Sequence, residues 1–264
     1  MRRTTTATAA SCNTCCAACS TAEGRRLLDP QIVLIAGTTV LLGAVVQGTV
    51  GFGVGLVAAP VVTLLDPSLM PGSLLVVVFL LAVMSLVSEH QDLDPRVGWV
   101  FAGRFLGTIA GAGIVVALSR EDLAIGIGVM TLLAVLLSVR SFAVPVNRWT
   151  LAGAGCVSGI GATTSSIGGP PLAFIYQRSD PATLRSTVAL VFTAGSALSI
   201  GALSVAGEMT VRELLAGLAF IPFFTVGFAL SHPWRKRLRG PRFRQAVLVV
   251  IAASAVVLLV RPFA

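Results

Sequence analysis

Charged side chains are scarce in this sequence. Only 11% of its 264 residues are Asp, Glu, Lys or Arg, whereas soluble domains carry about 25%. Hydrophobic residues make up 55%, and the mean hydropathy is +0.92. So little charge does not cover the surface of a soluble globule of this length, which excludes a soluble enzyme, a disordered chain and a coiled coil. The composition predicts an all-α polytopic membrane protein.

Side chains and motifs that carry catalysis are also scarce. Histidine occurs only as His90 and His232, and neither has a Ser or Cys partner at a spacing that suggests catalysis. The sequence has no H-E-x-x-H, no G-x-S-x-G and no phosphate-binding loop. We therefore expect a protein that is not an enzyme, does not hydrolyse ATP by itself and uses no cofactor.

Cysteine is concentrated at the N-terminus. Four of the five cysteines form the string CNTCCAAC, as Cys12, Cys15, Cys16 and Cys19, within a Thr/Ala-rich tail that covers residues 1–30. Their spacing leaves two alternatives, a disordered tail or a metal or redox site. No His or acidic residue stands among them, so we favour disorder and expect no metal site. The tail also lacks the apolar core of a signal peptide.

Long apolar runs are what the sequence has in abundance. A bilayer requires about 20 apolar residues per helix, and about eight such runs follow one another with short connections that leave no room for a soluble domain. The runs cover residues 32–66, 72–88, 97–118, 122–139, 149–177, 184–206, 211–231 and 243–261.

Two of these runs are too long for a single crossing and are interrupted by glycine and proline. The first is interrupted by GTVGFGVG (residues 48–55) and then by Pro60, and the fifth by SGIGATTSSIGGPP (residues 158–171). Because proline and clustered glycine disfavour helix, we predict that each of these runs is a broken or re-entrant helix.

The two interruptions also predict a duplicated chain. Gly48 and Gly159 are separated by 111 residues, as are Pro60 and Pro171. We expect two four-segment repeats, each opening with an interrupted helix. If both interrupted segments re-enter, the repeats are inverted, and if both cross fully, the repeats are parallel. The expected repeats span residues 31–140 and 141–264.

Interrupted segments at matching positions of two halves indicate a transporter's binding site. Broken helices expose backbone groups that only protein or a watery cavity satisfies, and the positive end of a half-helix attracts an anion. Consecutive hydroxyl residues at 163–166 add neutral donors. The alternative is that the small residues only allow close helix packing. The candidate substrate-binding residues are Gln47, Gly48, Gly51, Gly53, Gly55, Ser158, Gly159, Gly161, Thr163, Thr164, Ser165, Ser166, Gly168 and Gly169, with Pro60, Pro170 and Pro171 as helix breakers.

Two arginines are candidate charges on the pathway. Arg104 lies inside the third run and either snorkels to the interface or attracts an anion within the bundle. Arg185 lies at the start of the sixth run, where it would guard a vestibule. The neighbouring carboxylates Glu89, Asp92 and Asp94 are interpreted as a solvated acidic turn.

The excess of basic residues predicts which side of the membrane each loop faces. The net charge is +8, and six of the 19 Lys and Arg residues stand between 235 and 244. Positive residues favour the cytoplasmic side, so we expect the loop 231–243 to be cytoplasmic and the C-terminus to lie outside. The lipid bilayer is the expected partner rather than nucleic acid, and the oligomeric state is left open between monomer and homo-oligomer.

Three strings resemble a known family. GAVVQGTVGFGVGLVAAPVVTLL (43–65) is similar to the glycine-rich signature of the TauE/SafE sulfite exporter family, and GAGCVSGIGATTSSIGGPPLAFIY (153–176) to its second-half counterpart. FAGRFLGTIAGAGIVVAL (101–118) resembles the family's third segment. The resemblance covers about 32–261. GFGVG stands where the family commonly has consecutive glycines, and hydroxyl residues replace part of the second glycine pattern.

The resemblance implies a bacterial inner-membrane transporter built as a four-plus-four duplication. Its substrates would be sulfur-containing anions such as sulfite, sulfoacetate or thiosulfate. We therefore predict a secondary transporter that moves a small anion of this class by alternating access at the paired broken helices, with Arg104 or Arg185 drawing the anion in. The alternatives are an anion channel with the same pore, or a non-transporting membrane scaffold or enzyme.

Overall fold

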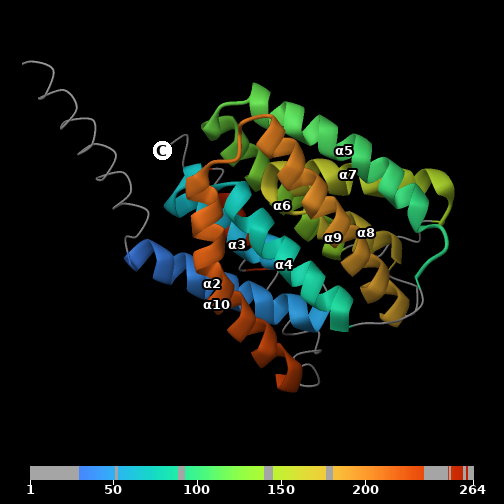
Figure 1. Cartoon of the computed structure of the whole chain (residues 1–264), viewed down its shortest axis with the longest axis horizontal. Helices are drawn as coiled ribbons and strands as arrows, with labels where there is room; N and C mark the ends of the chain where they lie inside the picture. The colour runs from blue at the N-terminus through green and yellow to red at the C-terminus, as the bar shows by residue number, and fades with distance from the viewer. Residues whose placement is uncertain are drawn as a thin grey trace, which may run out of the picture.

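The computed structural model describes residues 30–50, 53–88, 93–139, 145–176 and 181–234, together with residues 249, 251–257 and 260. The elements in order are α2 (Pro30–Val50), α3 (Val54–Leu65), the 3-10 helix η1 (Pro67–Leu69), α4 (Gly72–Ser88), α5 (Val97–Ala117), α6 (Arg120–Val139), α7 (Arg148–Ser165), α8 (Gly169–Ile175), α9 (Pro181–Val205) and α10 (Val211–Trp234) (Figure 1). Seven of the predicted apolar runs coincide with these helices, and most of the eighth lies outside the described residues.

The described part of the chain is all helical and suited to a membrane. Four of its helices are long and apolar enough to cross a bilayer, namely α2, α5, α9 and α10. Their outer faces carry exposed aliphatic side chains such as Leu106, which is 64% exposed, and Leu215, which is 53% exposed. Apolar exposure on this scale is costly in water and favourable against lipid. The chain is therefore a multi-pass membrane protein.

The first predicted interruption is confirmed, but it is shorter than the predicted residues 48–55. Helix α2 ends at Val50, α3 begins at Val54, and Gly53 between them has φ 153°, a conformation that L side chains rarely adopt. Helix α3 then folds back on α2, because a Cβ at Gly43 would lie 3.0 Å from the Val54 Cα. The first long run is thus a helical hairpin.

The second interruption is confirmed, but it is shorter than predicted. Residues 158–165 belong to α7, which continues to Ser165, and only residues 166–168 separate it from α8. Ser166 has the left-handed φ of 59°, and its N–H bonds back to the carbonyls of Ala162 and Gly161. This arrangement satisfies the last carbonyls of a helix. Hydroxyl residues before it bond to their own helix, which explains why they do not break it.

The prediction that Pro60 breaks a helix is wrong. Pro60 lies inside α3, which continues to Leu65, and it is buried beside the fully buried Ala59. Packing against neighbouring helices compensates for the hydrogen bond that proline removes. Pro170 and Pro171 lie in the first turn of α8, where the missing N–H is not needed for the helix. They begin a helix there rather than interrupt one.

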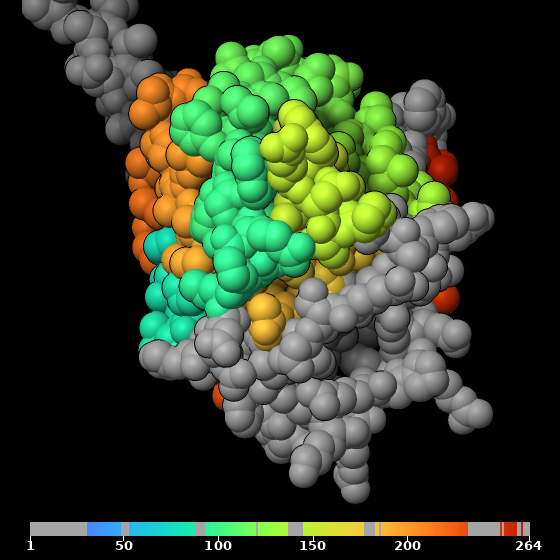
Figure 2. All heavy atoms as spheres, turned by 90° about the vertical axis from the view of Figure 1, so that its right-hand side faces the viewer, coloured from blue at the N-terminus to red at the C-terminus, as the bar shows by residue number. Residues whose placement is uncertain are grey.

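Two pairs of helices pack side by side in parallel. Along α5, Gly103 faces Ala152 of α7 and Gly107 faces Cys156 of α7. The two helices therefore run in the same direction. Helices α2 and α10 do the same, because Gly37 faces Phe223 and Gly227 faces Leu41. Figure 2 looks at the end where α5 and α7 begin and shows them side by side, in green and yellow.

The two helical hairpins open on opposite sides of the molecule. We call the end where α2 and α10 begin the first side, and the end where α5 and α7 begin the second side; they lie at the left and right of Figure 1. Asp66, just after α3, pairs with Arg212 at the start of α10. Arg96, just before α5, bonds to Val146 just before α7. The α2–α3 hairpin therefore opens on the first side and the α7–α8 hairpin on the second.

Candidate functional site

The two helix breaks meet at one pocket in the middle of the molecule. The pocket is open at its mouth, and the empty space between its walls together with that open region amounts to about 390 Å³. The first break contributes Gln47, Gly53, Gly55 and Leu56; the second contributes Ala162, Ser166, Ile167, Gly168, Gly169 and Pro170; α4 and α9 add Leu75, Val78 and Phe192. Seven of the residues predicted from sequence line this pocket: Gln47, Gly53, Gly55, Ser166, Gly168, Gly169 and Pro170.

The two helix breaks are in contact at Gly55, because glycine has no side chain there. A Cβ at Gly55 would overlap the carbonyl oxygen of Ser166, so a larger residue would force the two hairpins apart. Ser166 also donates from its hydroxyl to the Pro71 carbonyl at 3.1 Å, which fixes the second break to the start of α4. The central pocket is thus built from backbone contacts between segments that are far apart in sequence.

Gln47 closes the first break with its side chain. It lies near the end of α2, is 8% exposed, and its Oε1 accepts the N–H of Val54 at 2.9 Å. That bond caps the first turn of α3. Because the amide oxygen holds α3, the amide nitrogen is the end of the side chain that is available to a ligand in the pocket.

Arg104 lies behind the pocket lining, where it contacts the lining residues Gly168 and Phe192. It is 1% exposed, and its Nη1 donates to the Ser158 hydroxyl at 2.6 Å. Ser158 in turn donates to the Gly168 carbonyl at 2.6 Å, and the guanidinium carbon lies 5.4 Å from the centre of the Phe192 ring. Arg104 Nε and Nη2 have no hydrogen-bond partner among the described residues.

The snorkelling alternative for Arg104 is therefore wrong. The side chain points into the bundle, where it passes directly over Gly195 of α9; a Cβ at that position would overlap Nε. Glycines at 155 and 159 hold α7 against the α5 backbone on the other side. The space for the guanidinium group therefore exists inside the bundle rather than at the interface.

The consecutive hydroxyls are mostly directed into their own helix. Thr163, Thr164 and Ser165 donate to carbonyls four residues earlier, at 2.9, 2.9 and 2.6 Å. Thr163 also contacts the Ser199 hydroxyl of α9 at 2.9 Å. Of these four consecutive residues, Ser166 alone lines the pocket.

The other predicted residues lie around the pocket. Gly48 packs on Ser231, Gly159 on the α5 backbone, and Gly161 on Ile167. Arg185 lies in the first turns of α9. Gly51, the side chain of Arg185 and the cysteine string 12–19 lie outside the described residues.

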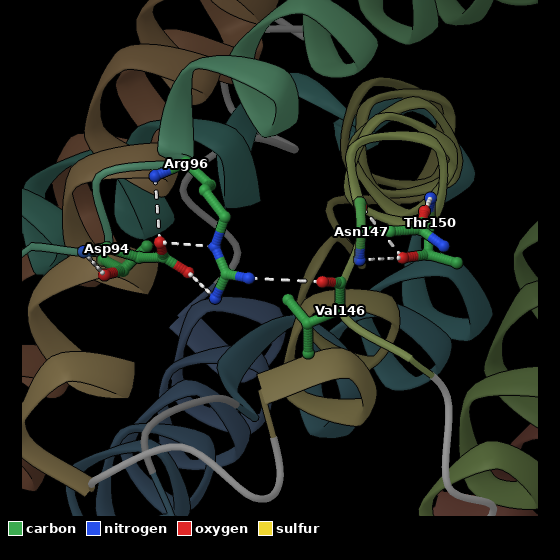
Figure 3. A network of polar contacts seen from close by, with 6 residues as sticks. Asp94, Arg96, Val146, Asn147 and Thr150 are labelled. Carbon is green, nitrogen blue, oxygen red and sulfur yellow. Dashed lines mark hydrogen bonds and ion pairs between the residues drawn. The ribbon is translucent and has the colours of Figure 1, made fainter.

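A polar cluster joins the starts of three helices, α5, α7 and α9, on the second side (Figure 3). Asp94 is 6% exposed and accepts from the Arg96 backbone N–H at 2.9 Å and from Arg96 Nε at 3.2 Å. Its own N–H donates to Thr187 of α9 at 3.2 Å, and Arg96 Nη1 donates to the Val146 carbonyl at 3.2 Å. Asn147 then caps α7 by accepting from the backbone of Trp149 and Thr150.

The interpretation of this acidic turn as solvated is wrong for Asp94; Glu89 and Asp92 lie outside the described residues. Burial acts to raise the pKa of Asp94, but the hydrogen bonds and the charge of Arg96 outweigh it, so its pKa lies below the usual value. The Asp94 carboxylate in turn raises the pKa of Arg96. The pair therefore remains ionised near neutral pH.

A comparable cluster lies on the first side. Arg212 Nη2 contacts Asp66 Oδ2 at 2.9 Å, and Arg212 Nη1 donates to the Ser68 hydroxyl at 2.9 Å. Glu213, which is fully buried, accepts from the Thr210 N–H at 2.9 Å. In the described part of the chain, no group of three or more His, Cys, Asp or Glu side chains is placed to hold a metal ion.

Two features of the site could not be predicted from the sequence. Phe192 is an ordinary apolar residue of a membrane helix, and nothing in its pattern indicates a pocket wall. Ser158 was predicted as a ligand, but in the structure it joins Arg104 to Gly168. Both relations depend on contacts between helices, which the sequence does not specify.

The chain matches a known protein family. The family model described as "Sulfite exporter TauE/SafE" matches residues 35–258, which include both helix breaks and the pocket. Searches of the curated proteins and of the solved structures gave no match. Since the matched range covers most of the 264 residues, the chain belongs to the TauE/SafE sulfite exporter family of membrane transporters.

Proposed function

We propose that the protein is a secondary transporter of a small anion, a sulfur oxyanion or organosulfonate of the sulfite, thiosulfate and sulfoacetate class. The anion would bind in the pocket between the two helix breaks and cross the membrane by alternating access. Membership of the TauE/SafE family supports the transport of a sulfur anion.

The observation that carries this proposal is the pocket shared by both breaks, with a buried arginine behind two of its lining residues, Gly168 and Phe192. In a membrane interior, a buried cation favours a nearby anion, and interrupted helices offer backbone donors to it. The pocket walls supply the Gln47 amide and the backbone of both breaks. This combination of one cation and neutral donors is suited to a small anion.

The pairing of the helices supports a duplicated, inverted arrangement. If α2–α3 corresponds to α7–α8 and α5 corresponds to α10, the pairing of α5 with α7 is the counterpart of the pairing of α10 with α2. The two hairpins then open on opposite sides because the halves are inverted. Inverted repeats around a central site are a common basis for alternating access.

The distribution of basic residues supports an orientation. Helix α10 ends on the second side, and the basic residues between 235 and 244 follow it in sequence. Arg96 and Arg148 also lie at the ends of helices on that side. By the positive-inside rule the second side faces the cytoplasm of a bacterial inner membrane, and α2 begins outside.

The proposal is tested by uptake of labelled sulfite, thiosulfate and sulfoacetate into proteoliposomes that contain the purified protein. We expect saturable uptake that is accelerated when the vesicles are preloaded with the same unlabelled anion. A channel with the same pore would show no such acceleration. If the wild-type protein moves none of the three anions, the proposal is wrong.

The position of the site is tested with Gly168→Val. A Cβ there would lie 2.9 Å from the Ala162 Cβ and 3.1 Å from Arg104 Nη1, so valine should distort the pocket and abolish uptake. Gly153→Val is the matched control, because Gly153 is an exposed glycine of α7 with nothing within 4 Å of its Cβ position. Equal uptake by the two variants would place the site elsewhere.

A further inference from the structure

The guanidinium group of Arg104 is only partly satisfied by protein. Its Nη1 bonds to Ser158, but Nε and Nη2 are buried and have no hydrogen-bond partner among the described residues. No carboxylate of the described chain forms an ion pair with it. A buried charge without a counter-charge is strongly unfavourable, so the guanidinium is suited to an anionic ligand.

The two unpartnered nitrogens lie on the same edge of the guanidinium plane. This edge presents two parallel N–H groups, and it is the edge that binds two oxygens of one carboxylate, phosphate or similar oxyanion. We infer that the Nε–Nη2 edge of Arg104 holds the transported anion through two of its oxygens. This inference rests on the proposed function and specifies the ligand class as oxyanions with two or more oxygens on one atom.

Two further buried hydroxyls lie on α5 and α9, the helix that carries Arg104 and a helix that packs against it. Neither Thr108 Oγ1 nor Ser196 Oγ has a hydrogen-bond partner within the part of the chain that the structure describes. Thr108 lies one turn after Arg104 on α5, and Ser196 directly follows Gly195, the residue over which the guanidinium passes. These hydroxyls are neutral donors that would bind the remaining oxygens of a sulfite or sulfonate group without the cost of a second buried charge.

Ser158 positions the guanidinium. It accepts from Nη1 and donates to the Gly168 carbonyl, both at 2.6 Å, so the occupied nitrogen of Arg104 is fixed to the second helix break. The other edge is thereby directed away from α7. Phe192 both lines the pocket and lies against the guanidinium group. We therefore expect an anion that enters the pocket to reach the edge when the ring or the guanidinium moves.

We therefore expect the protein to prefer oxyanions to chloride because of their geometry and not because of charge alone. An oxyanion engages both N–H groups, whereas chloride, a single atom, does not form the two parallel bonds. Lysine keeps the positive charge but lacks the two parallel N–H groups of the guanidinium edge. The decisive variant is therefore Arg104→Lys, with Arg96→Lys as matched control, because Arg96 is an exposed arginine outside the pocket.

The experiment measures binding of sodium sulfite and of sodium chloride to the purified protein by calorimetry and by the rise in thermal unfolding midpoint at constant ionic strength. Wild type should prefer sulfite. Arg104→Lys should lose about tenfold in sulfite affinity, about 1.4 kcal/mol, with little change for chloride. Ser158→Ala should weaken sulfite binding but keep the preference for sulfite. Arg96→Lys should match wild type.

The outcomes separate this inference from the proposed function. If wild type transports sulfite and Arg104→Lys binds sulfite as tightly and selectively as wild type, the bidentate role is wrong and the transport proposal stands. If wild type binds chloride as well as sulfite, the inference is also wrong, and this result requires no variant to fold. If wild type transports none of the labelled anions, the proposed function fails.

Discussion

The break between α2 and α3 is closed by a neutral side chain, whereas the break between α7 and α8 is held by a charged one. Gln47 caps α3 from within the same hairpin. At the second break, Ser158 and Gly168 are joined to Arg104, which belongs to another helix. The first hairpin is closed by its own side chain, whereas the second has an internal bond from Ser158 to Gly168 and is bonded in addition to Arg104 of α5.

This difference indicates a division of roles within one pocket. A self-contained hairpin keeps its geometry when neighbouring helices shift, because its hydrogen bonds are local. A hairpin bonded to a buried cation responds to whatever neutralises that cation. We therefore expect the first break to act as a fixed wall and the second to change on anion binding, and the variants below challenge this contrast.

The contact between the breaks should give the largest effect. In Gly55→Val, the Cβ would overlap the Ser166 carbonyl oxygen, and two packed backbones have little freedom to separate. Overpacking of this kind costs about 3 kcal/mol, so we expect a large fall in the free energy of unfolding in detergent, together with loss of uptake. Gly113→Val, at an exposed glycine with nothing near its Cβ position, should be close to wild type. Equal stability of the two variants would show that the breaks do not touch.

The cap of the first break should give the next largest effect. Gln47→Leu leaves the Val54 N–H without its acceptor, and an unsatisfied buried donor costs about 1–3 kcal/mol. Gln47→Glu keeps an acceptor for that N–H but places negative charge at the pocket. We expect the leucine variant to lose stability, and the glutamate variant to lose anion uptake while its unfolding midpoint stays closer to wild type.

The Gln47 pair of variants separates capping from ligand binding. If Gln47→Glu transports the anion at the wild-type rate, the side chain does not face the substrate. If Gln47→Leu is as stable as wild type, the first break does not depend on its own cap, and the contrast with the second break is lost.

Much of the fold follows from local sequence, but the site does so only in part. The apolar runs predicted the helices because about 20 apolar residues are required to cross a bilayer. The positions of both breaks also followed from glycine density. Pro60 was misjudged because tertiary packing supports the helix around it, and residues 158–165 because their hydroxyls bond to their own helix. The direction of Arg104 depends on Gly195, which is 91 residues away in sequence, so no local pattern contains it.

The backbone of the two breaks offers a smaller test. The first turn uses Gly53 at φ 153°, whereas the second uses Ser166 at φ 59°. A non-glycine residue in the left-handed region costs about 1 kcal/mol, so Ser166→Gly should be more stable than Ser166→Ala by about that amount. Both variants lose the hydroxyl bond to Pro71, so their difference in unfolding free energy isolates the backbone. A more stable alanine variant would contradict the left-handed assignment.

The smallest expected effect concerns the open end of the second hairpin, where Asp94 and Arg96 join the start of α5 to the start of α7. Because the folded state lowers the pKa of Asp94, its carboxylate stabilises the fold at pH values above its unfolded pKa of about 4. This contribution is lost as the pH falls through the folded value. Arg96 is 55% exposed, so the contribution should stay below about 1 kcal/mol.

Asp94→Asn removes the ionisation and therefore provides the reference. The difference in unfolding free energy between wild type and Asp94→Asn should be constant from about pH 7 to 5 and should shrink below about pH 4. Arg96→Gln should abolish this pattern, because burial alone raises the pKa of the carboxyl group. If instead wild type gains stability relative to Asp94→Asn as the pH falls, burial outweighs the arginine. The second hairpin would then be held at its open end by a neutral hydrogen bond, as the first hairpin is held at its break by Gln47.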